Sequence, residues 1–157
     1  MADQGRFGRI LVPTDGSKYS RKALSHAMGL AKMLGSSIHI IMVVDPGEFP
    51  PGMLLGLLKE DGMVQESMSK FMSLVKTRAR REVMAESSIC KSERIDVTCD
   101  ILSGKPAEMI LKYARGKKVG LIVIGSTGLR GLGRLKALGS VSRRVSELAP
   151  CPVMVVH

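Results

Sequence analysis

Glycines and hydroxyl residues gather in one stretch of the sequence, GSTGLRGLGRLKALGS, which spans residues 125–140. A phosphate site needs backbone N–H groups that converge on the anion, glycines that permit close approach, and ideally the start of a helix. The stretch has Gly125 and Gly128 at one end and Gly139 at the other, and Ser140 is expected to begin a helix. This backbone chemistry fits a cradle for phosphate groups, and a flexible turn is the alternative.

The common phosphate and catalytic motifs fit the chain poorly. Gly128 and Gly133 have the outer spacing of a P-loop, but Arg134 and Leu135 follow, so the hydroxyl that would hold magnesium is missing. The dinucleotide fingerprint belongs after the first strand, whereas this stretch comes late in the chain. The sequence has no G-x-S-x-G elbow, and its cysteines and histidines are widely separated. These patterns disfavour a P-loop enzyme, a NAD-dependent enzyme, a hydrolase and a metal site.

Short apolar segments alternate with amphipathic ones along the chain, and these elements must position the glycines. Strands are expected over residues 9–14, 37–44, 94–102, 119–124 and 152–156. Helices are expected from Ser17 to Gly35, in a long segment up to Ser88, from Pro106 onward, and from Ser140 to a point before Pro150. This order predicts an α/β fold, a three-layer α/β/α sandwich with a parallel sheet covered on both faces. Ligands of such sheets bind at the carboxyl ends of the strands, where the winding reverses.

The long second helix is expected to bury one apolar face. The residues on that face are Val64, Met68, Phe71, Met72, Val75, Ala79 and Val83. Glu86 is expected off this face, together with Lys70, Lys76 and Arg80. The methionines on the face are expected to pack in the core rather than to bind a ligand.

Length and charge limit the remaining classes of protein. The 157 residues predict one domain over residues 1–157. Apolar runs fall well short of the about 20 residues that span a bilayer, and the N-terminus lacks an apolar signal segment, which predicts a cytoplasmic protein with no membrane partner. The net charge of +10 attracts polyanions, but the few scattered aromatic residues and the lack of a helix-turn-helix pattern disfavour nucleic-acid binding.

Three pieces of the sequence together resemble the universal stress protein family of adenine-nucleotide-binding domains. They are ILVPTDGS at residues 10–17, MVVD at residues 42–45, and GSTG…GS followed by VSRRVSELAPCPVMVV. The resemblance covers nearly the whole chain. It implies a Rossmann-like sheet of five parallel strands in the order 3-2-1-4-5, and a homodimer joined through the last strand. An apolar last strand with an open edge suits that interface.

The resemblance also implies a nucleotide site at the carboxyl ends of the first and fourth strands. Its ten positions are Pro13, Thr14, Asp15, Val43, Ile124, Gly125, Gly128, Gly139, Ser140 and Val141. The residues that end these two strands would meet the ribose, and the backbone of Val43 would meet the adenine. The last four positions would hold the phosphates, close to a helix N-terminus whose dipole favours anions.

The chain departs from the family pattern at one point. That pattern is commonly Gly-x2-Gly-x9-Gly-Ser/Thr, whereas ten residues separate Gly128 from Gly139 here. A loop absorbs one more residue at little cost in closure entropy, so the cradle is expected to close. Arg130, Arg134 and Lys136 lie in that loop and either touch phosphate or face water.

The function that follows is that of a nucleotide-responsive stress regulator that binds ATP and acts on a downstream protein. Magnesium or manganese would be held mainly through the phosphates. The phosphate loop contains no Glu, His or Gln that could act as a general base, so the chain is expected not to be an enzyme beyond slow hydrolysis. The alternative is a universal stress protein that does not retain ATP and works through protein contacts alone.

Overall fold

A five-stranded parallel sheet forms the centre of the protein, in the order β3-β2-β1-β4-β5. The computed structural model describes residues 7–48, 64–128 and 138–157. The strands are β1 (Arg9–Thr14), β2 (Ser37–Val44), β3 (Val97–Ser103), β4 (Leu121–Gly125) and β5 (Val153–Val156). The α/β fold and the strand order expected from the sequence are both confirmed.

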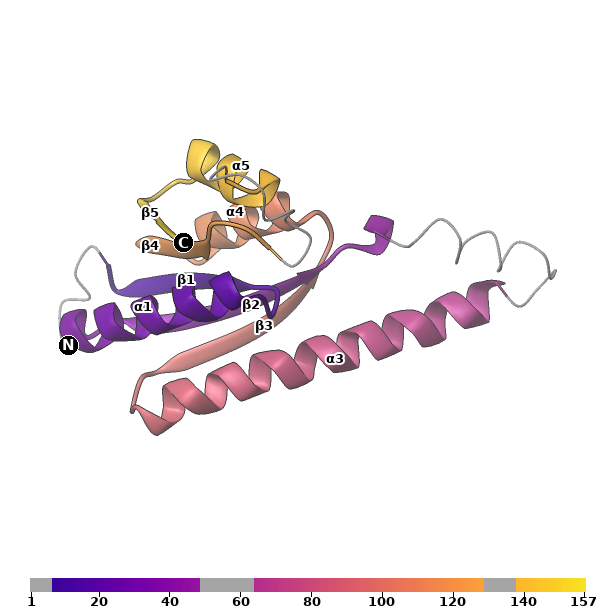
Figure 1. The fold of residues 1–157 in the computed structure, drawn as a ribbon, viewed down its shortest axis with the longest axis horizontal. Coiled ribbons are helices and arrows are strands. Elements are labelled where there is room, and N and C mark those ends of the chain that lie inside the picture. Colours follow the sequence, from indigo (N-terminus) through magenta and orange to yellow (C-terminus); the bar gives the residue numbers. More distant parts are fainter. Residues whose placement is uncertain (1–6, 49–63, 129–137) are drawn as a thin grey trace.

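Helices cover the sheet on both faces (Figure 1). They are α1 (Lys18–Leu34), α3 (Val64–Ser92), α4 (Pro106–Gly116) and α5 (Ser140–Leu148), and the short 3-10 helix η1 (Pro46–Glu48) follows β2. Helices α1 and α3 lie on one face, and α4 and α5 lie on the other. Among these described helices, none is long and apolar enough to cross a membrane.

The central strands bury side chains toward both helical layers. Ile10 and Val12 of β1 belong to the core cluster that includes residues of α1 and α3, while Leu11 between them belongs to the cluster formed with α4 and α5. All three side chains are fully buried. Successive side chains of a strand point to opposite faces, which is why β1 is apolar at these three consecutive positions.

Helix α1 begins and ends at the residues expected from the sequence. The Ser17 side chain accepts a hydrogen bond from the Ser20 N–H at 3.1 Å, which caps the first turn. Gly35 adopts the left-handed conformation, with φ of 66°, and its N–H bonds to the Ala31 carbonyl. These local contacts fix the direction in which the chain leaves β1 and enters β2.

The boundary between α3 and β3 differs from the prediction. Helix α3 continues to Ser92, and β3 begins at Val97 rather than at Arg94. Arg94 takes a left-handed conformation, with φ of 57°, and the Ile95 N–H donates to the Cys90 carbonyl at 3.0 Å. The residues assigned to the start of the strand therefore form the C-terminal closure of the helix.

The expectation that Glu86 lies off the buried face of α3 is wrong. Its side chain is only 4% exposed. Ala79, Val83, Glu86 and Cys90 are all buried and recur every three or four residues, which is the period of one helix face. The C-terminal half of α3 therefore places a carboxyl group inside the protein, while its N-terminal part extends past the carboxyl ends of the strands (Figure 1).

Candidate functional site

The candidate site lies where β1 and β4 end next to each other. These strands are paired in parallel, with Ile10 opposite Leu121 and Leu11 opposite Ile122. Continuing that register by three residues brings Thr14 level with Gly125. Strands β2 and β3 lie to one side of this pair and β5 lies to the other, so the winding of the sheet reverses here. This is the position at which open parallel sheets bind ligands.

Asp15 is held in a tight turn directly after β1. Its Oδ1 accepts a hydrogen bond from the Ser17 N–H at 2.9 Å, the pattern of an Asx turn. Gly16 between them has φ of 76°, a conformation that side chains disfavour. The hydrogen bond from Ser17 fixes the direction of the Asp15 carboxylate, and the residue is partly exposed at the carboxyl end of β1.

Gly128 lies directly against Asp15. A methyl group built on Gly128 would come within 2.6 Å of Asp15 Oδ2, so a side chain there would require a shift. The two residues are far apart in the sequence and belong to different predicted motifs. The fold thus brings the ribose residue and the phosphate glycine of the sequence prediction together.

The other end of the glycine stretch closes on the end of β4. The Gly139 N–H donates to the Ser126 carbonyl at 2.8 Å, and the Ser142 hydroxyl donates to the Gly125 carbonyl at 2.6 Å. Both ends of the motif therefore meet beside Asp15 although ten residues separate Gly128 from Gly139. Residues 129–137 lie outside the described part of the chain. The prediction that Arg130, Arg134 and Lys136 either touch phosphate or face water concerns that segment.

Helix α5 begins at this point with an open N-terminus. Gly139 is its N-cap and provides no side-chain hydrogen bond, and the first turn contains no acidic residue. By contrast, Ser17 caps α1, and Glu108 occupies the first turn of α4. Uncapped N–H groups together with the helix dipole favour an anion, and an acidic residue opposes one. Of these three helix starts, that of α5 suits a phosphate best.

Apolar residues form the wall beside these polar groups. Val43 follows Met42, which is the register partner of Thr14 in β1. Val43 and Val141 are both partly buried and pack against the same core cluster, which includes the buried Ile124. A flat apolar base would find a suitable surface beside such residues. Pro13 is buried within β1, and Ser140 is exposed at the first position of α5.

The sequence analysis missed a buried polar cluster behind the Asp15 turn. The Thr14 hydroxyl donates to Glu86 Oε1 at 2.8 Å and lies 3.2 Å from the Ser20 hydroxyl. Burial raises the pKa of the Glu86 carboxyl above its ordinary value, and the neighbouring Glu82 carboxylate adds to this, while the Thr14 hydrogen bond opposes it. In the sequence, Ala79, Val83 and Cys90 follow the period of one helix face on which Glu86 also falls, and this pattern was the signal that could have identified Glu86.

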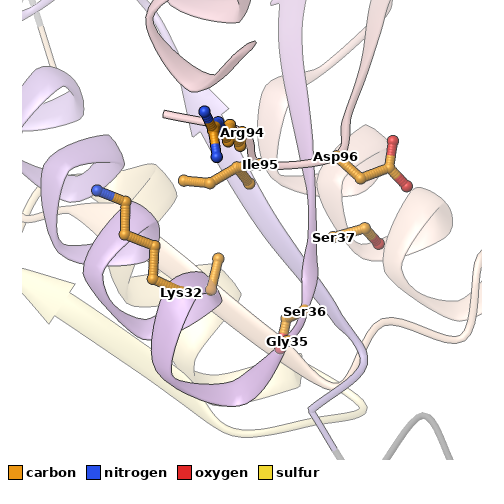
Figure 2. A pocket seen from close by; sticks show the side chains of 8 residues that line it. Lys32, Gly35, Ser36, Ser37, Arg94, Ile95 and Asp96 are labelled. Carbon is orange, nitrogen blue, oxygen red and sulfur yellow. The ribbon is translucent and has the colours of Figure 1, made fainter. Parts of the chain in front are cut away.

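A hollow lies at the opposite end of the sheet from the candidate site (Figure 2). Its volume is about 410 Å³, and its lining includes Lys32, Ser37, Arg94 and Asp96. Ser37 begins β2 and Asp96 precedes β3, so the hollow is at the amino ends of the strands. Lys32 is already paired with Glu93. None of the predicted site residues lines this hollow.

Metal ligation by protein side chains finds no support in residues 7–48, 64–128 and 138–157. Within these ranges no group of three or more His, Cys, Asp or Glu residues is placed to hold a metal ion. The described residues of the site offer backbone N–H groups, the Asp15 carboxylate and an apolar wall.

Comparison with known sequences identifies one family. The model of the universal stress protein family matches residues 6–157. Universal stress protein MJ0531 of Methanocaldococcus jannaschii is 38% identical to this chain over 157 residues, covering 96% of the chain and 82% of the relative. Universal stress protein YxiE of Bacillus subtilis is 34% identical, with 96% of the chain and 99% of the relative covered.

Comparison with solved structures gives the same fold. Protein MJ0577 of Methanocaldococcus jannaschii is similar with a TM-score of 0.82 at 25% identity, over 96% of each chain. A universal stress protein in complex with cAMP has a TM-score of 0.67 at 22% identity, over 96% of this chain and 97% of that one. One from Archaeoglobus fulgidus in complex with dAMP has a TM-score of 0.65 at 20% identity, over 96% and 98%.

Proposed function

This chain belongs to the universal stress protein family, and we propose that it binds an adenine nucleotide, with ATP as the expected ligand, at the carboxyl ends of β1 and β4. One observation carries the proposal. Gly128 lies against Asp15, and Gly139 bonds to Ser126 beside the uncapped start of α5. A carboxylate suited to ribose hydroxyls and a helix start suited to phosphates thus lie together at the carboxyl ends of the strands.

Each part of the nucleotide would meet residues of matching chemistry. The ribose would lie at the end of β1, where Asp15 offers a carboxylate oxygen, and the adenine would lie on the apolar side near Val43. The phosphates would be held by Gly128 and by the first turn of α5, which contains Ser140 and the Val141 N–H. Magnesium or manganese would be bound mainly by phosphate oxygens and water, as hard cations are where protein carboxylates are few.

The solved structures support the class of ligand. The two complexes described above contain cAMP and dAMP, which share an adenine, a sugar and a phosphate. At 22% and 20% identity, those proteins share the fold with this chain, and the assignment of ATP here rests on the residues of its own site. The proposed role is regulatory, in the cytoplasm, with nucleotide occupancy controlling contacts to a downstream protein, and not catalytic.

The experiment is an ATP titration of the purified protein with magnesium, together with mass spectrometry of any nucleotide released on denaturation. We expect saturable ATP binding and a Kd in the micromolar to low millimolar range. Absence of binding at millimolar ATP would contradict the proposal and favour a family member that acts through protein contacts alone.

A glycine substitution locates the phosphates. Gly139→Val is expected to weaken ATP binding, because the side chain would narrow the space at the start of α5, while the backbone tolerates it with φ of −61°. Gly29→Ala is the matched control, since a methyl group at Gly29 on α1 meets nothing within 4 Å. Unchanged affinity in a folded Gly139→Val protein would show that the phosphates bind elsewhere.

A further inference from the structure

Glu86 is a buried carboxyl group directly behind the candidate site. Its side chain is 4% exposed, and its Oε1 accepts the hydrogen bond from Thr14 at 2.8 Å. Its second oxygen, Oε2, is buried without a hydrogen-bonding partner in the part of the chain that the structure describes. Burying a carboxyl group with an unsatisfied oxygen costs stability. A core position on α3 would be more stable with an apolar residue, so a role beyond packing is indicated.

Thr14 connects Glu86 to the turn that carries Asp15. The Thr14 oxygen accepts a hydrogen bond from the Gly16 N–H at 3.3 Å, and its hydroxyl is also close to Ser20 in the first turn of α1. Thr14 itself is buried at the end of β1. Glu86 therefore fixes the rotamer of Thr14. The Thr14 oxygen in turn binds the N–H of Gly16, the residue that follows Asp15.

A second contact from α3 reaches the same turn. Glu82, one helical turn before Glu86, forms an ion pair with Arg21 of α1 at 2.8 Å. A methyl group built on Gly16 would come within 3.3 Å of Glu82 Oε1. The charged groups around Glu86 are thus Glu82 on its own helix, Arg21 on α1 and Asp15 after β1. Glu82 and Glu86, on successive turns of α3, thus both lie against the segment from Thr14 to Gly16.

We propose that Glu86 is a positioning residue for nucleotide binding: through Thr14 it holds the Asp15–Gly16 turn in the conformation that presents the Asp15 carboxylate to the ribose. This inference rests on the proposed nucleotide-binding function. Glu86 does not touch the ligand, and its effect passes through the Thr14 hydroxyl. Affinity for nucleotide therefore depends on a residue of α3, which contributes no residue to the predicted binding site.

The test measures ATP affinity and unfolding stability for variants at both ends of this contact. Glu86→Leu and Thr14→Val each remove the hydrogen bond and are expected to weaken ATP binding about tenfold, the effect of losing one positioning hydrogen bond. Glu86→Gln keeps an oxygen that accepts from Thr14, so it is expected to restore affinity to within about twofold of the parent protein. Combining Glu86→Leu with Asp15→Ala is expected to weaken binding no further than Asp15→Ala alone, because Asp15→Ala already removes the ribose contact that Glu86 positions.

Tyr113→Phe controls for general destabilisation. It removes the Tyr113 hydroxyl that donates to Asp100 at 2.6 Å in the other layer of the sheet, away from the Asp15 turn. It is expected to lower stability and to leave ATP affinity unchanged. If the parent protein binds ATP and folded Glu86→Leu and Thr14→Val bind it equally well, the positioning role is wrong while the proposed function stands. If the parent protein fails to bind, the proposed function itself fails.

Discussion

The three glycines of the candidate site differ in how far the fold itself requires a glycine. A methyl group on Gly125 would lie 2.7 Å from the carbonyl carbon of Tyr19, so β4 and the start of α1 can approach only at a glycine. Gly128 leaves room for the Asp15 carboxylate. Gly139 has ordinary backbone angles, and its nearest neighbour would be 3.4 Å away, so the fold alone does not require a glycine there. Of the three, Gly139 is the position best explained by a ligand.

Gly125→Ala should destabilise the protein without regard to any ligand. The added methyl group would meet main-chain atoms that cannot rotate away, and forced overpacking of this kind costs about 1–3 kcal/mol of unfolding free energy. Urea unfolding monitored by circular dichroism measures the change, with Gly29→Ala as the control: its methyl group meets nothing within 4 Å on α1, so it is expected to stabilise the protein by about 0.5–1 kcal/mol. A Gly125→Ala protein as stable as the parent would show that β4 and α1 can separate at little cost.

The contribution of Glu86 to the free energy of unfolding should fall as the pH rises, whereas that of most carboxylates increases with pH. Folding raises the pKa of Glu86 above its ordinary value of 4.5, chiefly through burial, so the folded state holds the proton more tightly than the unfolded chain. The stabilisation from this group is then present at acidic pH and is lost as the pH rises through the folded pKa. The advantage of Glu86→Gln over the parent protein is expected to grow as the pH increases above 4.5.

Glu93 provides a control whose contribution to stability should change with pH in the opposite direction. Its hydrogen bond and charge interaction with Lys32 lower the pKa of Glu93, so its contribution is present at neutral pH and is lost as the pH falls. Urea unfolding of the parent protein, Glu86→Gln and Glu93→Gln over a series of pH values separates the two effects. A difference between Glu86→Gln and the parent that does not vary with pH would show that Glu86 keeps an ordinary pKa.

At the scale of the element, the start of α5 distinguishes a ligand site from a structural cap. Aspartate is a favoured N-cap residue, and the φ and ψ of Gly139 are those of an N-cap. Gly139→Asp is therefore expected to raise stability by a few tenths of a kcal/mol while a carboxylate replaces the phosphate at the helix start. ATP binding should be lost by charge repulsion, and Gly139→Asn, a neutral cap of the same shape, should lose less. ATP titration of both variants gives the comparison, and equal affinities would contradict an anion site at α5.

The elements that the sequence predicted well are those with local signals. Helix α1 begins at the Ser17 cap and ends at Gly35, and both residues form hydrogen bonds with residues three or four positions away in the sequence. The start of β3 was misplaced because the Arg94 turn is set by α3 continuing to Ser92, which no local pattern marks. The contact between Gly128 and Asp15 could be expected only from the family resemblance, since their separation in sequence is large. The bond from Thr14 to Glu86 depends on how α3 packs, and it was missed altogether.

At the scale of the whole molecule, the sheet has an open side at β5. Strand β5 pairs with β4 and, within the described residues, with no other strand. The Ile122 N–H bonds to the Pro152 carbonyl and the Ser126 N–H bonds to the Val156 carbonyl, so the even-numbered residues of β5 face β4. Residues alternate sides along a strand, which directs the backbone groups of Val153 and Val155 to the open edge. Such an edge pairs readily with a second copy of itself.

We expect the protein to be a homodimer through this edge, and Val155→Pro to separate the protomers. Proline removes the N–H that would pair with the partner, and the pairing of even-numbered residues with β4 leaves the internal sheet bonds in place. Light scattering after size-exclusion chromatography measures the mass, and Met154→Thr, a change at the neighbouring residue that keeps every backbone N–H, is the control expected to remain dimeric. A parent protein that runs as a monomer at all concentrations would contradict the dimer. A Val155→Pro protein that folds and stays dimeric would move the interface away from β5.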